Sequence, residues 1–180
     1  ISPNSAINEE QPTALDPESL CEQIFTPGSP VRDPRYLLGR LQELDDLQRI
    51  ARRPGQHAVI SGNRGVGKTS LARRFCDSFT TVAWRSCTPE DTFSSVFSDL
   101  LAQLNILENG TKLTPPRILQ QLKKISDKAI LVIDEFDAIQ NRNGSTMAKN
   151  VSSLMKMLSD HSDATDVRLA VVGVSRTAED

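Results

Sequence analysis

The chain has 180 residues, enough for one domain with a substantial hydrophobic core. Its 21 basic and 23 acidic residues give a formal net charge of −2, so overall charge gives no support for a protein that binds nucleic acid electrostatically. No apolar stretch approaches the roughly 20 residues that span a bilayer, and no signal peptide is recognisable. The cytoplasm is therefore the expected location, and no membrane partner is expected.

The amino-terminal segment is rich in Ser, Pro, Asn, Gln and acidic residues. Such a composition buries too little apolar surface to offset the entropy lost on ordering, so residues 1–22 are expected to form a flexible arm. The folded domain is expected over residues 23–180. An amphipathic helix comes early in it and ends at Pro54-Gly55, and its inner face is expected to carry Leu41, Leu44, Leu47 and Ala51.

Residues 62–69 read Gly-Asn-Arg-Gly-Val-Gly-Lys-Thr and have the spacing of a phosphate-binding loop. A strand expected over residues 56–61 precedes this loop and a helix follows it, which is the context that the motif requires. Glycines let backbone N–H groups surround an oligophosphate, Lys68 can reach its β and γ oxygens, and the Thr69 hydroxyl can bind magnesium. The residues predicted to bind the nucleotide here are Gly62, Asn63, Arg64, Gly65, Val66, Gly67, Lys68, Thr69 and Ser70.

Strands and helices alternate along the rest of the chain. Thr88 is expected to cap a helix with Pro89 at its first position, and a polar loop over residues 141–144 is expected before the last helix. The remaining strands are expected at residues 81–84, 129–133 and 167–174. This order predicts an α/β fold with a mostly parallel sheet and helices on both faces.

Polar residues follow three of these strands. Ligands of such sheets bind beyond the carboxyl ends of the strands, and the phosphate loop, Asp134-Glu135 and Ser175 all lie at such ends. Asp134 would hold magnesium through water and complement Thr69, and Glu135 would polarise an attacking water as a general base. The alternative is that both carboxylates merely solvate the end of a strand.

Three segments together resemble the AAA+ P-loop ATPases: residues 62–69, the run Ile-Leu-Val-Ile-Asp-Glu at 130–135 and the run Leu-Gly-Arg-Leu-Gln-Glu-Leu at 38–44. More narrowly, the chain resembles the branch of origin-recognition-type initiators and prokaryotic STAND-like ATPases. The resemblance covers residues 24–176. It implies the three-layer P-loop NTPase fold, with residues 62–69 as Walker A, Asp134-Glu135 as Walker B, and ATP with Mg²⁺ as the ligands.

The resemblance also implies roles for residues outside these two motifs. Gly39 and Arg40, which begin a Gly-Arg-x-x-Glu-Leu segment, would lie against the adenine, and Ser175 would sense the γ-phosphate. The predicted catalytic residues are thus Glu135, Lys68 and Ser175. The family's fifth strand, helical lid and arginine finger are expected beyond residue 180, so the core is expected to be truncated. Three arginines are expected to be surface charges rather than fingers: Arg142, Arg168 and Arg176.

The function expected from this resemblance is that of an ATPase acting as a nucleotide-dependent assembly switch, in which a neighbouring copy of the chain completes the site. One alternative is a DNA-associated initiator or transposition-regulator ATPase, for which the net charge gives no support. A second is a module that binds ATP or ADP without hydrolysing it. A phosphotransferase is disfavoured because Glu135 supplies a group that activates water.

Overall fold

The computed structural model describes residues 40–108, 110, 112–139 and 141–174. Gly39, Ser175 and Arg176 lie outside this part of the chain, as do the arm expected over residues 1–22 and the side chain of Arg142. The helices and strands, in chain order, are α2 (Leu41–Arg52), β1 (Ala58–Gly62), α3 (Lys68–Cys76), β2 (Thr81–Ser86), α4 (Phe93–Gln103), α5 (Pro115–Leu122), β3 (Ala129–Asp134), the 3₁₀ turn η2 (Phe136–Ala138), α6 (Asn141–Asp160) and β4 (Val167–Val174).

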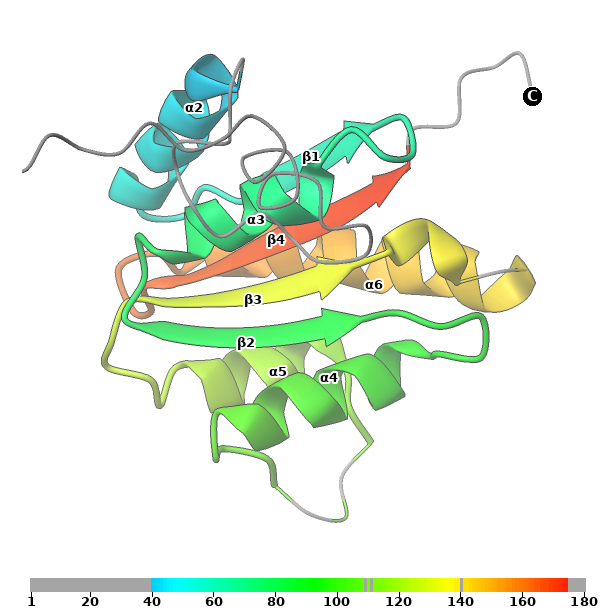
Figure 1. Cartoon of the computed structure of the whole chain (residues 1–180). Helices are drawn as coiled ribbons and strands as arrows, with labels where there is room; N and C mark the ends of the chain where they lie inside the picture. Colours follow the sequence, from blue (N-terminus) through cyan, green and yellow to red (C-terminus); the bar gives the residue numbers. More distant parts are fainter. Residues whose placement is uncertain (1–39, 109, 111, 140, 175–180) are drawn as a thin grey trace, which may run out of the picture.

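The described strands form one four-stranded sheet in the order β1-β4-β3-β2, and every pair in it is parallel. The register places Ile60 beside Val172 and Leu131 beside Leu169. Because all four strands run the same way, their carboxyl ends meet at one edge of the sheet (Figure 1). The predicted α/β fold with a parallel sheet is confirmed, and this edge is where its ligand site is expected.

Helices cover both faces of the sheet (Figure 1). On one face α4, α5 and α6 pack against alternate residues of β3, including Leu131 and Ile133. On the other face α2 and α3 pack against Ile130 and Val132. All six residues of β3 are buried. A parallel strand covered on both sides is expected to be a continuous apolar run, and this is why β3 was easy to recognise in the sequence.

Helix α4 begins later than the sequence suggested. Thr92, and not Thr88, is its N-cap: the Thr92 hydroxyl accepts the Ser95 N–H at 3.2 Å, and the Ser95 hydroxyl accepts the Thr92 N–H at 2.9 Å. Thr88 instead donates its N–H, at 2.8 Å, and its hydroxyl to the buried carboxylate of Asp91. Two competing capping signals lie four residues apart, and the reciprocal pair at Thr92 satisfies more of the free helix donors.

Three further expectations about helices and side chains are wrong. Leu41 is 72% exposed because it lies in the first turn of α2, whereas Leu47 and Ala51 deeper in that helix are buried. Residues 141–144, expected as a loop, form the first turn of α6. Arg168 is only 1% exposed, since β4 carries it under α2, where it donates to Asp166 and, at 3.4 Å, to the Ala51 carbonyl.

Strand β2 lies at an edge of the described sheet. At its centre, the Trp84 N–H donates to the Gln103 side-chain oxygen at 2.9 Å, and the Gln103 side-chain nitrogen donates to the Trp84 carbonyl at 3.0 Å. The guanidinium of Arg73 lies over the Trp84 ring, 3.7 Å from its centroid. Both polar backbone groups of Trp84 are therefore satisfied by the end of α4.

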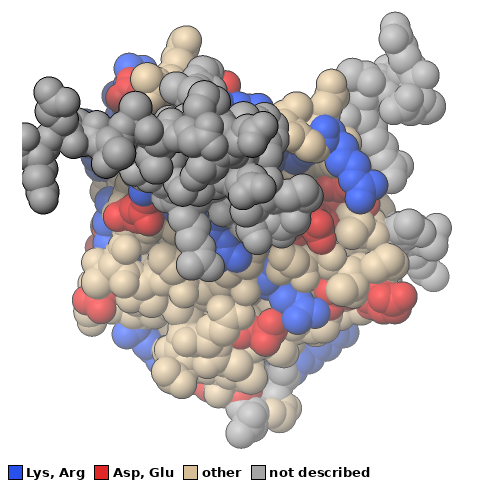
Figure 2. All heavy atoms as spheres, viewed as in Figure 1, with Lys and Arg blue, Asp and Glu red and all other residues tan. Residues whose placement is uncertain are grey.

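On the face shown in Figure 2, basic and acidic side chains are interspersed among uncharged ones. No helix in the described ranges has the length and apolar character needed to cross a membrane.

His57, directly before β1, connects β4 with α6. Its Nδ1 accepts the Leu169 N–H at 3.0 Å, and its Nε2 lies 2.9 Å from the Met155 carbonyl oxygen, to which the neutral ring donates. Burial lowers the pKa of His57 from 6.5 to about 4, and the nearby Arg168 adds to this, against the raising effect of the Met155 hydrogen bond. The folded protein therefore holds this imidazole neutral well below the pH at which an exposed one ionises.

We expect the free energy of unfolding to fall by about 2 kcal/mol between pH 7 and pH 5 on account of His57. In the unfolded chain His57 takes up a proton with a pKa of 6.5, whereas in the folded chain it does so only near pH 4. The contribution of neutral His57 to the free energy of unfolding is therefore fully present above pH 6.5 and is lost as the pH falls toward 4. Urea unfolding at several pH values, with His57→Gln beside wild type, measures this contribution. His161→Gln is the control, and an unchanged pH slope in His57→Gln would contradict the expectation.

Candidate functional site

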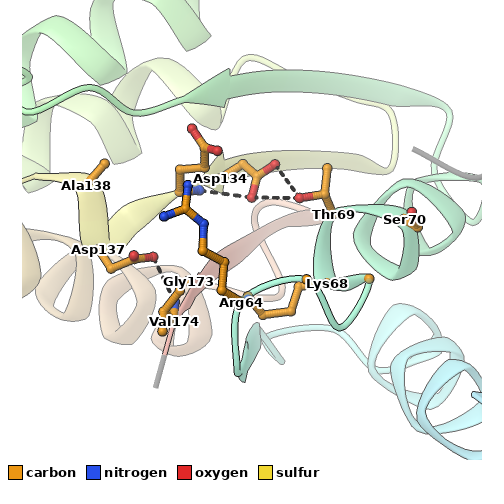
Figure 3. Close-up of a pocket in the computed structure, with 12 residues that line it drawn as sticks. Arg64, Lys68, Thr69, Ser70, Asp134, Asp137, Ala138, Gly173 and Val174 are labelled. Carbon is orange, nitrogen blue, oxygen red and sulfur yellow. Dashed lines mark hydrogen bonds between the residues drawn. The ribbon is translucent and has the colours of Figure 1, made fainter. Parts of the chain in front are cut away.

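A cavity of about 570 Å³ opens at the carboxyl edge of the sheet (Figure 3). Its walls are the loop between β1 and α3, the turn that follows β3, and the end of β4. These segments are far apart in the sequence and meet because their strands are parallel neighbours. The cavity contains most of the side chains that the sequence singled out.

The loop between β1 and α3 has a backbone conformation that favours glycine at two positions. Gly65 and Gly67 both have φ of +81°, a left-handed conformation that side chains rarely adopt. A Cβ at either position would meet nothing within 4 Å, so conformation rather than crowding requires glycine there. Helix α3 begins at Lys68, directly after this loop. Its free N–H groups and the positive end of its dipole therefore lie beside the cavity, where they favour a negatively charged ligand.

Lys68, the first residue of α3, reaches back to the start of this loop. Its Nζ donates to the carbonyls of Gly62, at 3.0 Å, and Asn63, at 2.8 Å. Both acceptors are neutral, and hydrogen bonds from an ammonium to charged oxygens are stronger than those to neutral ones. An anionic ligand in the cavity can therefore compete for this ammonium.

Arg40 lies at the start of α2 and contacts the same loop. Its guanidinium donates to the Val66 carbonyl. It thus bonds to the backbone of the loop between β1 and α3, a contact that the sequence did not suggest for a residue expected beside the adenine. A second arginine, Arg64, belongs to the loop itself and extends its side chain across the cavity toward the end of β3 (Figure 3).

Thr69 and Asp134 come from different elements and meet at the bottom of the cavity. The Thr69 hydroxyl donates to the two oxygens of the Asp134 carboxylate, at 3.1 and 3.4 Å, and Asp134 is only 3% exposed (Figure 3). Both offer hard oxygen atoms of the kind that Mg²⁺ prefers. Within the described ranges, no group of three or more His, Cys, Asp or Glu side chains could hold a metal. Thr69 and Asp134 thus offer two oxygen ligands that could serve a magnesium ion completed by water and a bound ligand.

Glu135 follows Asp134 and lies on the wall of the cavity with an exposed side chain. Its φ is +52°, a left-handed conformation that costs a residue other than glycine about 1–2 kcal/mol. Its N–H donates to the Asp134 carboxylate at 2.9 Å, and its carbonyl accepts the Ala138 N–H at 2.8 Å. These bonds maintain the strained turn, which directs the backbone from the buried strand around the cavity wall.

Cys87 lies close behind these carboxylates. Its N–H donates to the Asp134 carbonyl at 2.8 Å, and its side chain is buried. Burial, together with the charges of Asp91, Asp134 and Glu135, raises the pKa of the thiol to about 12 despite the opposing effect of Arg85. The thiol stays neutral, so Cys87 is a packing residue and not a nucleophile.

The sequence did not single out Asp137 and Gly173, which also line the cavity. The Asp137 carboxylate accepts the N–H of Val174, the last residue of β4, at 2.7 Å. The signal available in the sequence was a third carboxylate, two residues beyond Glu135, in the turn after the most apolar strand. Its partner on β4 could not be deduced without the register of the sheet.

A family model described as an AAA domain matches residues 51–179. No curated protein matches the chain significantly. The chain is similar in structure to Cdc6p from Pyrobaculum aerophilum, with a TM-score of 0.62 and 20% identity over 86% of this chain and 43% of that one. It is also similar to the Walker-type ATPase PABY2304 of Pyrococcus abyssi, with a TM-score of 0.56 and 15% identity over 84% of this chain and 49% of that one.

A third similar structure is the Aeropyrum pernix ORC2 protein in its ADPNP-ADP complexes, with a TM-score of 0.55 and 16% identity over 85% of this chain and 45% of that one. The chain spans less than half the length of each of these three proteins. At such low identity the likeness is one of fold.

Proposed function

Because this chain belongs to the AAA domain family of P-loop ATPases, we propose that it binds Mg-ATP at the described cavity, hydrolyses it, and acts as a nucleotide-dependent assembly switch. The observation that carries the proposal is the convergence of Lys68, the Thr69–Asp134 pair and Glu135 on one cavity beside the start of α3. A strand end that was merely solvated would not bring a buried carboxylate into contact with the phosphate loop.

The phosphates would take the place of the loop carbonyls as acceptors for Lys68. The N–H groups at the start of α3 would hold the same oxygens, because the helix dipole favours negative charge there. Thr69 and Asp134 would hold the magnesium ion, which supplies charge neutralisation at the β and γ oxygens. Ser70, at the start of the same helix, completes the lining.

Glu135 is proposed as the general base. It is the carboxylate that stays exposed on the cavity wall, whereas Asp134 is buried against Thr69. The two neighbouring carboxylates would thus have different roles: the buried Asp134 would bind the metal, and the exposed Glu135 would activate water.

We further propose that a neighbouring copy of the chain completes the site. Hydrolysis of a phosphoanhydride needs positive charge at the γ-phosphate beyond that of the loop lysine and the metal. Arg64 extends across the cavity and could supply part of this charge from the same chain, whereas Arg40 is engaged with the Val66 carbonyl. A second chain is the source that an assembly switch requires, and turnover would then depend on association. Ser175 and Gly39 keep their expected roles in this proposal.

The test is the binding and turnover of Mg-ATP by the longest available form of the protein, over a range of protein concentrations, with and without double-stranded DNA. Turnover that increases more than linearly with protein concentration and is indifferent to DNA supports the assembly switch. Turnover raised by DNA would support a DNA-associated ATPase instead. Binding without turnover at any concentration would indicate a module that only binds nucleotide, and no binding would contradict the proposal.

A further inference from the structure

Asp137 fastens the turn after β3 to the end of β4. Strand β3 pairs with β4 only as far as Ile133 and Val171, whereas β4 continues to Val174. Beyond Val171 the side of β4 that faced β3 has no strand beside it. The Asp137 carboxylate takes that place, because its Oδ1 accepts the Val174 N–H at 2.7 Å (Figure 3).

The Asp137 carboxylate also lies close to the backbone of Gly173. A Cβ at Gly173 would lie 3.1 Å from the Asp137 Oδ1 and 3.6 Å from both the Asp137 nitrogen and the Phe136 Cβ. Gly173 has no left-handed φ, so its backbone conformation does not call for glycine. A side chain at position 173 would therefore press on the Asp137 carboxylate, because the end of β4 and the turn η2 are in close contact.

The turn that Asp137 holds is the one that carries Glu135. At one end of this turn Asp134 is bonded to Thr69 of α3, and at the other end Asp137 is bonded to β4. Between these two attachments Glu135 adopts its left-handed conformation. If the second attachment is lost, only the local bonds to Asp134 and from Ala138 hold the turn, so it can shift toward a less strained backbone and move the Glu135 carboxylate relative to the phosphate loop.

We infer that Asp137 is a positioning residue for ATP hydrolysis: through its hydrogen bond to Val174 it fixes where Glu135 lies over the phosphate loop. This inference rests on the proposed function. The role belongs to the acceptor oxygen and not to the negative charge. Asparagine, which keeps an oxygen at the same position, should therefore replace Asp137, whereas alanine should not.

The experiment compares wild type, Asp137→Ala and Asp137→Asn in the complete protein, and measures ATP affinity, steady-state turnover and thermal stability for each. Asp137→Ala is expected to lower kcat about 10- to 100-fold, the effect of a small misplacement of a reacting group. Its ATP affinity is expected to change little, because the phosphate loop and the Thr69–Asp134 pair remain. Asp137→Asn is expected to keep most of the wild-type kcat.

Gly173→Ala provides an independent variant, because it disturbs the same contact from β4 and should also lower kcat rather than affinity. Unchanged kcat in Asp137→Ala would overturn the inference, and so would an equal loss in Asp137→Asn, which would assign the effect to charge. If wild type binds ATP but does not turn it over under any condition, the proposed hydrolysis fails and the inference fails with it. Wild-type turnover beside an unaffected Asp137→Ala would overturn the inference alone.

Discussion

Replacement of Lys68 by alanine is expected to lower ATP affinity by about 100-fold or more without unfolding the chain. The wild-type ammonium has two neutral carbonyl partners in the loop, and phosphate oxygens would replace them with charged acceptors worth about 1.5–3 kcal/mol each. The loop contacts that Lys68 gives up on binding offset part of this gain. The alanine variant is therefore expected to lose roughly 3 kcal/mol of binding free energy, which corresponds to that change in affinity.

Isothermal titration with Mg-ATP measures the effect, and circular dichroism checks that the variant is folded. Lys156→Ala is a suitable control because Lys156 lies exposed on α6, away from the cavity. Equal affinities of wild type and Lys68→Ala would remove the phosphate loop from the proposed site. A matching loss in Lys156→Ala would show that the effect is one of net charge.

Replacement of Glu135 by glutamine is expected to leave ATP bound and to lower turnover about 100- to 10,000-fold. Glutamine has nearly the same shape, so the left-handed turn and its hydrogen bonds to Asp134 and Ala138 are retained. The neutral amide cannot accept a proton from water. ATP affinity is expected to stay within about twofold of wild type, since a surface substitution changes free energies by roughly 0.5 kcal/mol.

Single-turnover and steady-state rates of phosphate release in the full-length protein, beside direct ATP binding, separate these two effects. Glu90→Gln, an exposed carboxylate in the loop before α4, is the control for the loss of one negative charge. Wild-type rates in Glu135→Gln would show that another group activates the water. A loss of ATP binding in this variant would instead place Glu135 in contact with the nucleotide.

The positions of the strands and of the glycine loop between β1 and α3 were predictable because each depends on a local pattern. The run at 129–133 is apolar on both faces, and the glycines at 65 and 67 are required by backbone conformation alone. The order of the elements then led to a parallel sheet, and the parallel sheet placed Asp134 beside Thr69. Each of these predictions needs only the pattern of residues adjacent in the sequence or a general rule of sheet topology.

The details that failed depend on contacts between segments distant in sequence or on competition between similar signals. Nothing local distinguishes Arg168 from an exposed arginine, since its burial results from α2 lying over β4. The role of Asp137 depends on β4 continuing past the end of β3. The start of α4 was misplaced because Thr88 and Thr92 both have the composition of a cap.

The pairing of Gln103 with Trp84 has a consequence for how copies of this chain can associate. The exposed edge of a parallel sheet ordinarily offers backbone groups that a second polypeptide can join as an additional strand. At the centre of β2 the side-chain amide of Gln103, at the end of α4, already bonds to both the N–H and the carbonyl of Trp84. Another chain could extend the sheet there only by displacing that amide. The Gln103 contact thus opposes extension of the sheet through the centre of β2, and the proposed assembly would use surfaces that present side chains.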